Sequence, residues 1–251
     1  MINLAMLLLN LFLPVVLSIA SFLNPNPPAL TGQEVLKKMH AKYQGKFDPY
    51  FTFDQTAVSY KSPTDSSSQV WHEAIAFPGK LVIKFGEFEK GNGALFAQDS
   101  QYVFKDNVLQ NRSRRVHEVL VLGFDVYHQP VERTIGQMQE AGIDLSKAFS
   151  TTWQGRKVYV VGVSSLDEKA SHFIIDQEKL WVLQTVRQTG ERRNTVELKG
   201  YQNVQGNWIA TDLTFYLNGA KTLHEVYYNM RFPKTLPDHL FTVAGFPAAR
   251  W

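Results

Sequence analysis

The chain has 251 residues, 44% hydrophobic and 13% aromatic, so it can bury a large core and is not a disordered protein. It carries 26 Lys and Arg against 23 Asp and Glu, and this near balance excludes a dedicated nucleic-acid-binding protein. The absence of cysteine excludes disulfide scaffolds, thiolate zinc sites, iron–sulfur clusters, cysteine nucleophiles and a lipid anchor on cysteine.

The N-terminal segment differs from the rest of the chain. No charged residue precedes Glu34, and residues 4–23 are almost wholly apolar. About 20 apolar residues can span a membrane, but Pro14 interrupts the run, and Ser18-Ile19-Ala20 supplies the small residues of a cleavage site. We therefore predict a signal peptide at 1–20, a Pro- and Asn-rich extended segment at 21–30 and a single domain at 31–251. The alternative is an N-terminal membrane anchor that is retained. Export without cysteine favours the periplasm of a Gram-negative bacterium.

Three segments have helical signals. Thr31 and Glu34 have the spacing of a capping box, which predicts a helix that begins there and ends at Gly45. Residues 118–124 and 130–141 also have helical spacing, and the proline at position 130 suits a helix start.

Most of the remaining chain alternates apolar and polar residues, which is the period of β-strands. Pro78-Gly79 and Asn218-Gly219 are typical turns between antiparallel strands. Strands are expected at about residues 50–60, 69–77, 80–85, 94–98, 101–105, 109–115, 149–153, 157–163, 172–176, 180–188, 193–202, 208–217 and 223–232. We predict a mainly β (α+β) fold: one large curved antiparallel sheet, or half-barrel, of about a dozen strands, covered by two or three helices.

A curved sheet with helices across its mouth can enclose an apolar interior. The alternation identifies a face rich in large apolar residues, with Glu73 among them on the second strand. The candidate cavity-lining residues on this face are Phe51, Phe53, Trp71, Ile75, Phe77, Ile209, Leu213, Phe215, Leu217, Val226, Tyr228 and Met230. Periodicity identifies a buried face but does not distinguish a hollow interior from a filled core, so both interpretations stay open.

Motifs for catalysis, cofactors and metals are missing. The seven histidines form neither His-x-His nor His-x-x-x-His, and no nucleophile elbow or phosphate-binding glycine loop occurs. We therefore predict no enzyme activity, no cofactor and no metal site. Arg112, Arg114 and Arg115 form the one basic cluster, which is typical of a solvated sheet edge; the alternative is contact with an anionic lipid surface or a partner.

Several segments carry a family resemblance in their order and spacing. They are the amphipathic helix 35–43 with the aromatic strand 51–53, the segment 71–80, the strand ending in Ile-Asp at 173–178, and the terminal Leu-Pro-x-x-x-Phe at 236–241. Over nearly the whole chain from Gln33 onwards, the sequence resembles the LolA-like outer-membrane lipoprotein-sorting proteins. The family's lid-latching arginine on an early strand has no counterpart in residues 50–60.

The resemblance implies a half-barrel with a helical lid over an apolar cavity. The function expected from it is a periplasmic carrier or chaperone in outer-membrane biogenesis, which transports acyl chains of a lipid or lipoprotein without covalent chemistry. We expect a monomer with no nucleic-acid partner and no membrane span after signal cleavage; envelope proteins are further candidate partners. The alternative is a structural or regulatory envelope module with a filled core that binds a protein through its surface.

Overall fold

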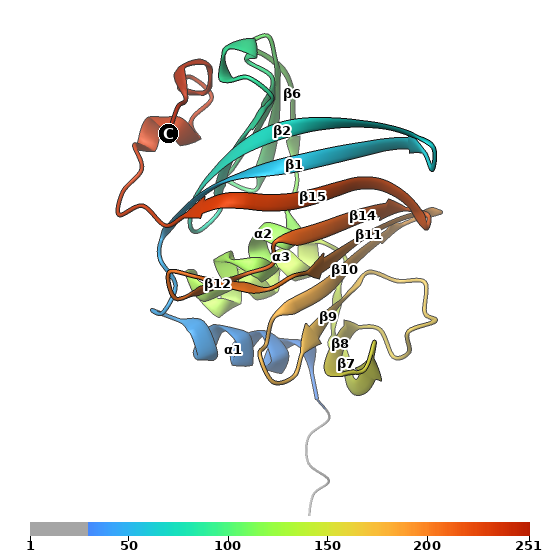
Figure 1. Ribbon diagram of the computed structural model, residues 1–251. Helices are drawn as coiled ribbons and strands as arrows, with labels where there is room; N and C mark the ends of the chain where they lie inside the picture. The colour runs from blue at the N-terminus through green and yellow to red at the C-terminus, as the bar shows by residue number, and fades with distance from the viewer. Residues whose placement is uncertain (1–29) are drawn as a thin grey trace, which may run out of the picture.

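One antiparallel sheet dominates the computed structural model, which describes residues 30–251 (Figure 1). Its thirteen strands follow the order β6-β5-β4-β3-β2-β1-β15-β14-β11-β10-β9-β8-β7, and β12 pairs separately with β13. The sheet is open and its edges are β6 and β7, which confirms the predicted mainly β fold with a single large curved sheet. The predicted signal peptide at 1–20 lies outside the described residues, as does the predicted extended segment at 21–30 except for its last residue.

The elements have the following bounds. The strands are β1 Tyr50–Ser62, β2 Asp65–Ala76, β3 Lys80–Phe85, β4 Gly93–Ala97, β5 Ser100–Lys105, β6 Val108–Arg114, β7 Asp144–Trp153, β8 Arg156–Gly162, β9 His172–Asp176, β10 Val182–Thr189, β11 Arg192–Lys199, β12 Gln202–Val204, β13 Asn207–Ile209, β14 Asp212–Leu217 and β15 Ala220–Arg231. The helices are α1 Gly32–Tyr43, α2 Glu118–Gly123 and α3 Val131–Glu140, with 3-10 turns η1 Phe88–Lys90, η2 Asp125–Tyr127, η3 Asp238–Phe241 and η4 Phe246–Ala248. None of the helices within residues 30–251 has the length and apolar character needed to cross a membrane.

Helix α1 begins where the capping box predicts. The Thr31 N–H donates to Glu34 Oε2 at 2.8 Å, and the Glu34 N–H donates to Thr31 Oγ1 at 3.2 Å. These bonds satisfy two backbone donors that a helix start otherwise leaves unpaired. The buried side of the helix carries Val35, Leu36 and Met39, and the helix packs against β7, β8 and α3.

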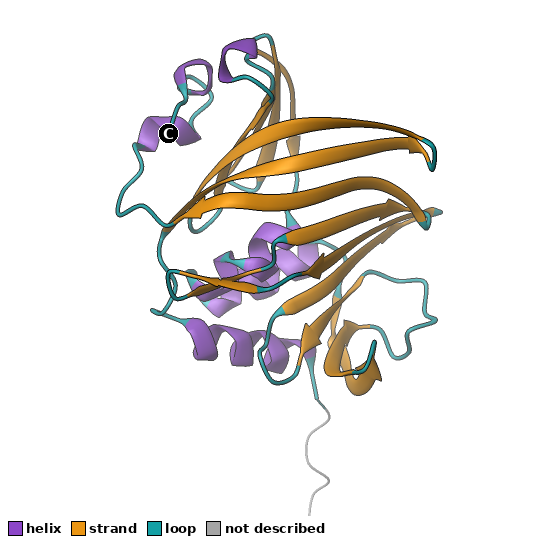
Figure 2. Cartoon of the chain, viewed as in Figure 1, coloured by secondary structure: helices purple, strands orange, loops and turns teal. Residues whose placement is uncertain are grey.

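All three helices lie on one face of the sheet, here named the inner face, and the sheet curves around them (Figure 2). Their apolar side chains form one core with β7 to β11 and β14, in which Leu122 and Met138 from the helices meet Phe173 and Ile175 from β9. Because the helices pack on the half of the sheet formed by β7 to β11 and β14, the inner face of β1 to β4 is less fully covered.

Several strand bounds differ from the prediction. The strands expected at 50–60 and 69–77 are longer in the structure, because β1 and β2 pair as far as Ser62 and Asp65. The strand predicted at 208–217 is divided, because β13 pairs with β12 while β14 joins the main sheet. At the break, Thr211 Oγ1 donates to the Gly200 carbonyl at 2.8 Å, which holds the chain between the two ladders.

The C-terminal segment covers part of the outer face. Its turns η3 and η4 bring Leu240, Phe241 and Phe246 onto β2 to β5. Phe246 is fully buried and stacks on Phe104 with ring centroids 3.8 Å apart. Beneath it, Lys84 Nζ donates to the Phe246 carbonyl at 2.6 Å and lies 3.7 Å from the ring centroid. The C-terminal segment therefore belongs to the packed structure.

We expect Phe246→Ala to lower the free energy of unfolding by about 3–5 kcal/mol, because it opens a cavity and removes the aromatic cover from Lys84. Urea unfolding followed by far-UV circular dichroism measures this change, with the exposed Val243→Ala as the control in the same segment. A loss below about 1 kcal/mol would show that the segment is not anchored by this residue.

Candidate binding pocket

A pocket of about 330 Å³ lies between the inner face of β1 to β4, β14 and β15 and helix α2. It is named the apolar pocket here, since aromatic and aliphatic side chains form most of its wall. The aromatic members are Phe53, Trp71, Phe85, Phe96, Phe124, Phe215 and Tyr227. Val119 and Leu120 of α2 form the cover. The inner face is therefore partly hollow, which the sequence pattern left undecided.

One end of this space is closed by stacked aromatic rings. Phe51 lies 4.8 Å from Phe53 and 4.6 Å from Phe232, centroid to centroid. Phe124, directly after α2, stacks on Phe77 at 5.0 Å. These contacts join the helix cover to β1 and to the end of β2, so the cover is seated on aromatic side chains.

Three polar side chains lie on the inner face of the adjacent strands β2, β1 and β15. Glu73 on β2 and Glu225 on β15 line the apolar pocket and are 5% and 6% exposed. Gln55 on β1 lies between them: its cross-strand partners are Trp71 and Tyr227, which neighbour the two glutamates by the pairing register. Gln55 is fully buried, and neither polar atom of its amide has a hydrogen-bond partner among the described residues.

The two glutamates are held in their neutral form. Burial raises the pKa of Glu225 to about 8. Burial also raises the pKa of Glu73 well above its usual range, and the charge of Glu225 adds to that effect. A carboxyl with a raised pKa stays protonated near neutral pH, so the pair adds donors and acceptors to the pocket with little net charge.

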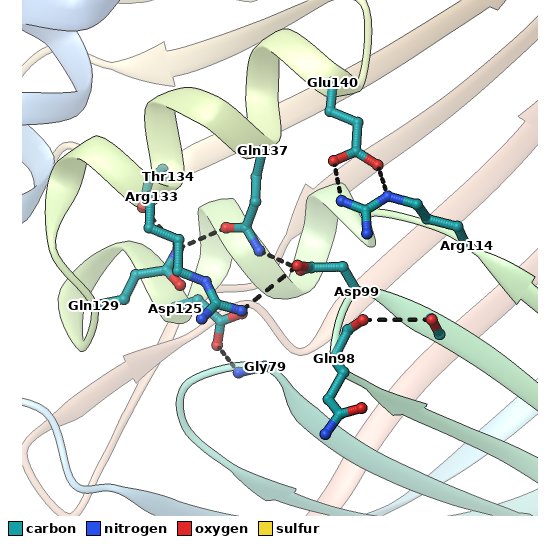
Figure 3. A network of polar contacts seen from close by, with 11 residues as sticks. Gly79, Gln98, Asp99, Arg114, Asp125, Gln129, Arg133, Thr134, Gln137 and Glu140 are labelled. Atoms are coloured by element: carbon teal, nitrogen blue, oxygen red, sulfur yellow. Dashed lines mark hydrogen bonds and ion pairs between the residues drawn. The ribbon is translucent and has the colours of Figure 1, made fainter.

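A network of polar contacts fixes the helical cover to the rim of the sheet (Figure 3). Gln137 of α3 donates through Nε2 to Asp99 Oδ1, in the β4–β5 turn, at 2.7 Å. Arg114 at the end of β6 makes two bonds to Glu140 at 2.6 and 2.7 Å. Asp125 of η2 accepts from a backbone N–H of the β2–β3 turn at 2.9 Å through Oδ1. The cover is thus tied to two turns of the sheet and to the end of β6.

A second, polar cleft of about 420 Å³ adjoins the apolar pocket and shares Arg115, His117, Val119 and Phe215 with it. It is named the arginine cleft, because Arg115, Arg187 and Arg192 line it. Burial lowers the pKa of His117 to about 3, so this imidazole is neutral. Its Nδ1 accepts from the Leu120 N–H at 3.2 Å as the cap of α2.

The structure distributes the twelve predicted lining residues over different environments. Phe53, Trp71, Ile75, Leu213 and Phe215 line the apolar pocket. Phe51 and Phe77 belong to the aromatic cluster at the end of the pocket, and Met230 packs against the same cluster. Ile209 lines a small neighbouring pocket near α2. Leu217 is half-buried and lies outside the apolar pocket. Val226 and Tyr228 are 40% and 36% exposed.

The placement of Val226 and Tyr228 on the cavity side is therefore wrong, and a β-bulge is the reason. Asp54 pairs with Tyr228, and Thr52 pairs with Arg231. A step of two residues along β1 therefore matches a step of three residues along β15. The extra residue inverts the alternation along β15. Tyr227 consequently faces the pocket before the bulge, and Met230 faces inward after it.

Sequence reasoning also missed lining residues that a signal in the chain could have identified. Asn229 has a φ of 51°, a conformation that asparagine adopts more readily than most residues. An asparagine inside an otherwise regular strand could thus have indicated a bulge. With the bulge taken into account, the alternation places Glu225 and Tyr227 on the inner face. Leu120 and Phe124 had no such sign, because they enter the pocket from the cover rather than from the sheet.

The arginine cluster on edge strand β6 is divided among different contacts. Arg114 is bound to Glu140, and Arg112 lies 5.4 Å from the Tyr102 ring centroid. Arg115 donates to Gln101 Oε1 at 3.0 Å and lines both the apolar pocket and the arginine cleft. Within residues 30–251, no three His, Asp or Glu side chains are grouped so that they could hold a metal ion.

The chain has the LolA-like fold, as its likeness to solved structures shows. No protein-family model matches it, and no curated protein matches its sequence. Among solved structures, a LolA superfamily protein from Nitrosomonas europaea has 15% identity, a TM-score of 0.54 and coverage of 85% of this chain and 98% of its own.

Two further solved structures share the fold. A domain described as an outer membrane lipoprotein-sorting protein domain, from Vibrio parahaemolyticus, has 14% identity and a TM-score of 0.56, covering 86% of this chain and 98% of its own. A DUF1329 family protein from Desulfovibrio piger has 12% identity and a TM-score of 0.55, covering 86% and 97%. At these identities the comparison establishes the fold.

The buried glutamate pair makes stability depend on pH. An acid whose pKa is raised from 4.5 to about 8 in the folded state binds more protons there than in the unfolded chain over this interval. The free energy of unfolding therefore falls as pH rises from 5 to 8. We expect Glu73→Gln/Glu225→Gln to flatten this slope and to raise stability at pH 8 by at least about 1.4 kcal/mol, the equivalent of one pKa unit.

Urea unfolding at pH 5 and pH 8 measures the slope, and the exposed Glu132→Gln serves as the control on α3. An unchanged slope in the double variant would mean that the pair is ionised, and well solvated, in the folded protein.

Proposed function

We propose that this protein is a periplasmic carrier that holds the acyl chain of a lipid or lipoprotein in the apolar pocket, without covalent chemistry. The observation that carries the proposal is the pocket of about 330 Å³ between the inner face and α2. Burying a chain there is favourable by about 25 cal/mol per Å² of apolar surface, before the costs of association are subtracted.

Two further features support a carrier. The LolA-like fold is shared with a domain described as an outer membrane lipoprotein-sorting protein domain. The cover consists of short elements, with six residues in α2 and ten in α3, and polar contacts tie its rim to the sheet beside the apolar packing of Leu122 and Met138. The polar contacts can be exchanged for water at modest cost, so the rim of the cover can open and admit a chain.

The alternative, an envelope module that binds a protein through its surface, depends on an interior filled by side chains. The hollow beneath α2 favours the carrier over this alternative. The protonated state of Glu73 and Glu225 also favours it, because an uncharged pair tolerates an adjacent hydrocarbon far better than two carboxylates do.

The test is uptake of a fluorescent fatty acid by the full chain and by Phe215→Asp. Phe215 is half-buried and lines the pocket, so a charge there must be desolvated by a bound chain. We expect the affinity to fall by at least about tenfold, corresponding to 1.4 kcal/mol. Tyr228→Asp, on the outer face of the neighbouring strand, is the control and should bind as the wild type does.

Circular dichroism of both variants confirms that the sheet is retained. Equal affinities of Phe215→Asp and the wild type would exclude the apolar pocket as the binding site, and no uptake by the wild type would reject the carrier function itself.

A further inference from the structure

The arginine cleft has an excess of positive charge beside an apolar space. Arg115, Arg187 and Arg192 line it, and Glu118 is the one acidic residue among its lining side chains. The neutral His117 adds no charge. Guanidinium groups recognise carboxylate and phosphate oxygens with two parallel hydrogen bonds, so three of them around one cleft are suited to an anionic group.

The three arginines differ in what they already bind. The Arg187 guanidinium is held by Glu118 and also donates through Nη2 to the Val116 carbonyl at 3.2 Å. The Arg115 guanidinium donates only to the neutral Gln101 oxygen, and Arg192 is exposed. Neither guanidinium is paired to a carboxylate within residues 30–251. Two cationic groups in the cleft are therefore available to a ligand.

Strand register places these groups together. Thr189 pairs with Arg192, and Arg187 pairs with Asn194, across β10 and β11. All four line the cleft on the inner face. On the neighbouring strand, Phe215 belongs to both the cleft and the apolar pocket. A ligand that lies across Phe215 can thus have its chain in the apolar pocket and its polar end in the arginine cleft.

We infer that the arginine cleft binds the anionic headgroup, a carboxylate or a phosphate, of an amphiphile whose chain occupies the apolar pocket. This inference rests on the proposed carrier function and adds the class of ligand. It also gives the ligand an orientation: the chain end points toward Glu73 and Glu225, and the headgroup remains at the opening near Arg115 and Arg192.

The test compares four amphiphiles with a twelve-carbon chain: dodecanoate, dodecyl phosphate, dodecanol and dodecylamine. Dodecanol is kept below its aqueous solubility, and each of the others below its critical micelle concentration. Isothermal titration calorimetry on the full chain at pH 7 measures each affinity. We expect both anions to bind at least about tenfold more tightly than the alcohol and the amine, with a preference that weakens as salt is added. The ratio of the two anions identifies the headgroup chemistry.

The matched pair of variants is Arg192→Gln and Arg112→Gln. Both replace an exposed arginine without a carboxylate partner in the described chain, but Arg112 lies over the Tyr102 ring and outside both spaces. Arg192→Gln should lower the affinity for the anions by about threefold to tenfold and leave dodecanol unchanged. Arg112→Gln should change neither.

The outcomes separate the inference from the function on which it rests. No binding of any of the four amphiphiles would reject the carrier function. Equal binding of all four would keep the carrier and overturn the headgroup site. A preference for dodecylamine that disappears in Glu73→Gln/Glu225→Gln would also overturn it, by showing that the polar end of the ligand lies at the glutamate pair.

Discussion

The structure depends on the mismatch between one very large sheet and the small helices that cover it. Thirteen antiparallel strands twist and curl, and the inner face that results is too large for helices of twelve, six and ten residues to bury. The helices pack tightly on the half formed by β7 to β11. The other half receives only α2 and a set of aromatic rings, and the apolar pocket is the space that remains.

Polar groups in this space follow the same division. Where the pocket is deep, Glu73 and Glu225 are desolvated and protonated, so the wall carries little charge. Arg115 also lines the adjoining arginine cleft, where Arg192 is exposed. The two adjoining spaces together run from neutral to cationic, which matches the polarity of the anionic amphiphile that we infer.

Local signals predicted much of this arrangement. The capping box at Thr31 placed α1, and strand alternation placed Phe53, Trp71 and Ile75 on the inner face, because these features depend on neighbouring residues only. The alternation did not predict the inward residues of β15 correctly, because the β-bulge at Asn229 adds one residue. An added residue changes the face of the sheet to which the following side chains point. The arginine cleft could not be predicted, because it combines β10, β11 and the segment before α2, which meet only in the folded sheet.

A crystal structure of the full chain grown with dodecanoate tests the central claim most directly. The account predicts electron density for the chain beneath α2, in contact with Phe53, Leu120 and Phe215, with its carboxylate beside Arg115 or Arg192. It would be contradicted by a structure in which the side chains of the inner face and α2 fill this space, or in which the ligand binds elsewhere and leaves the pocket to water.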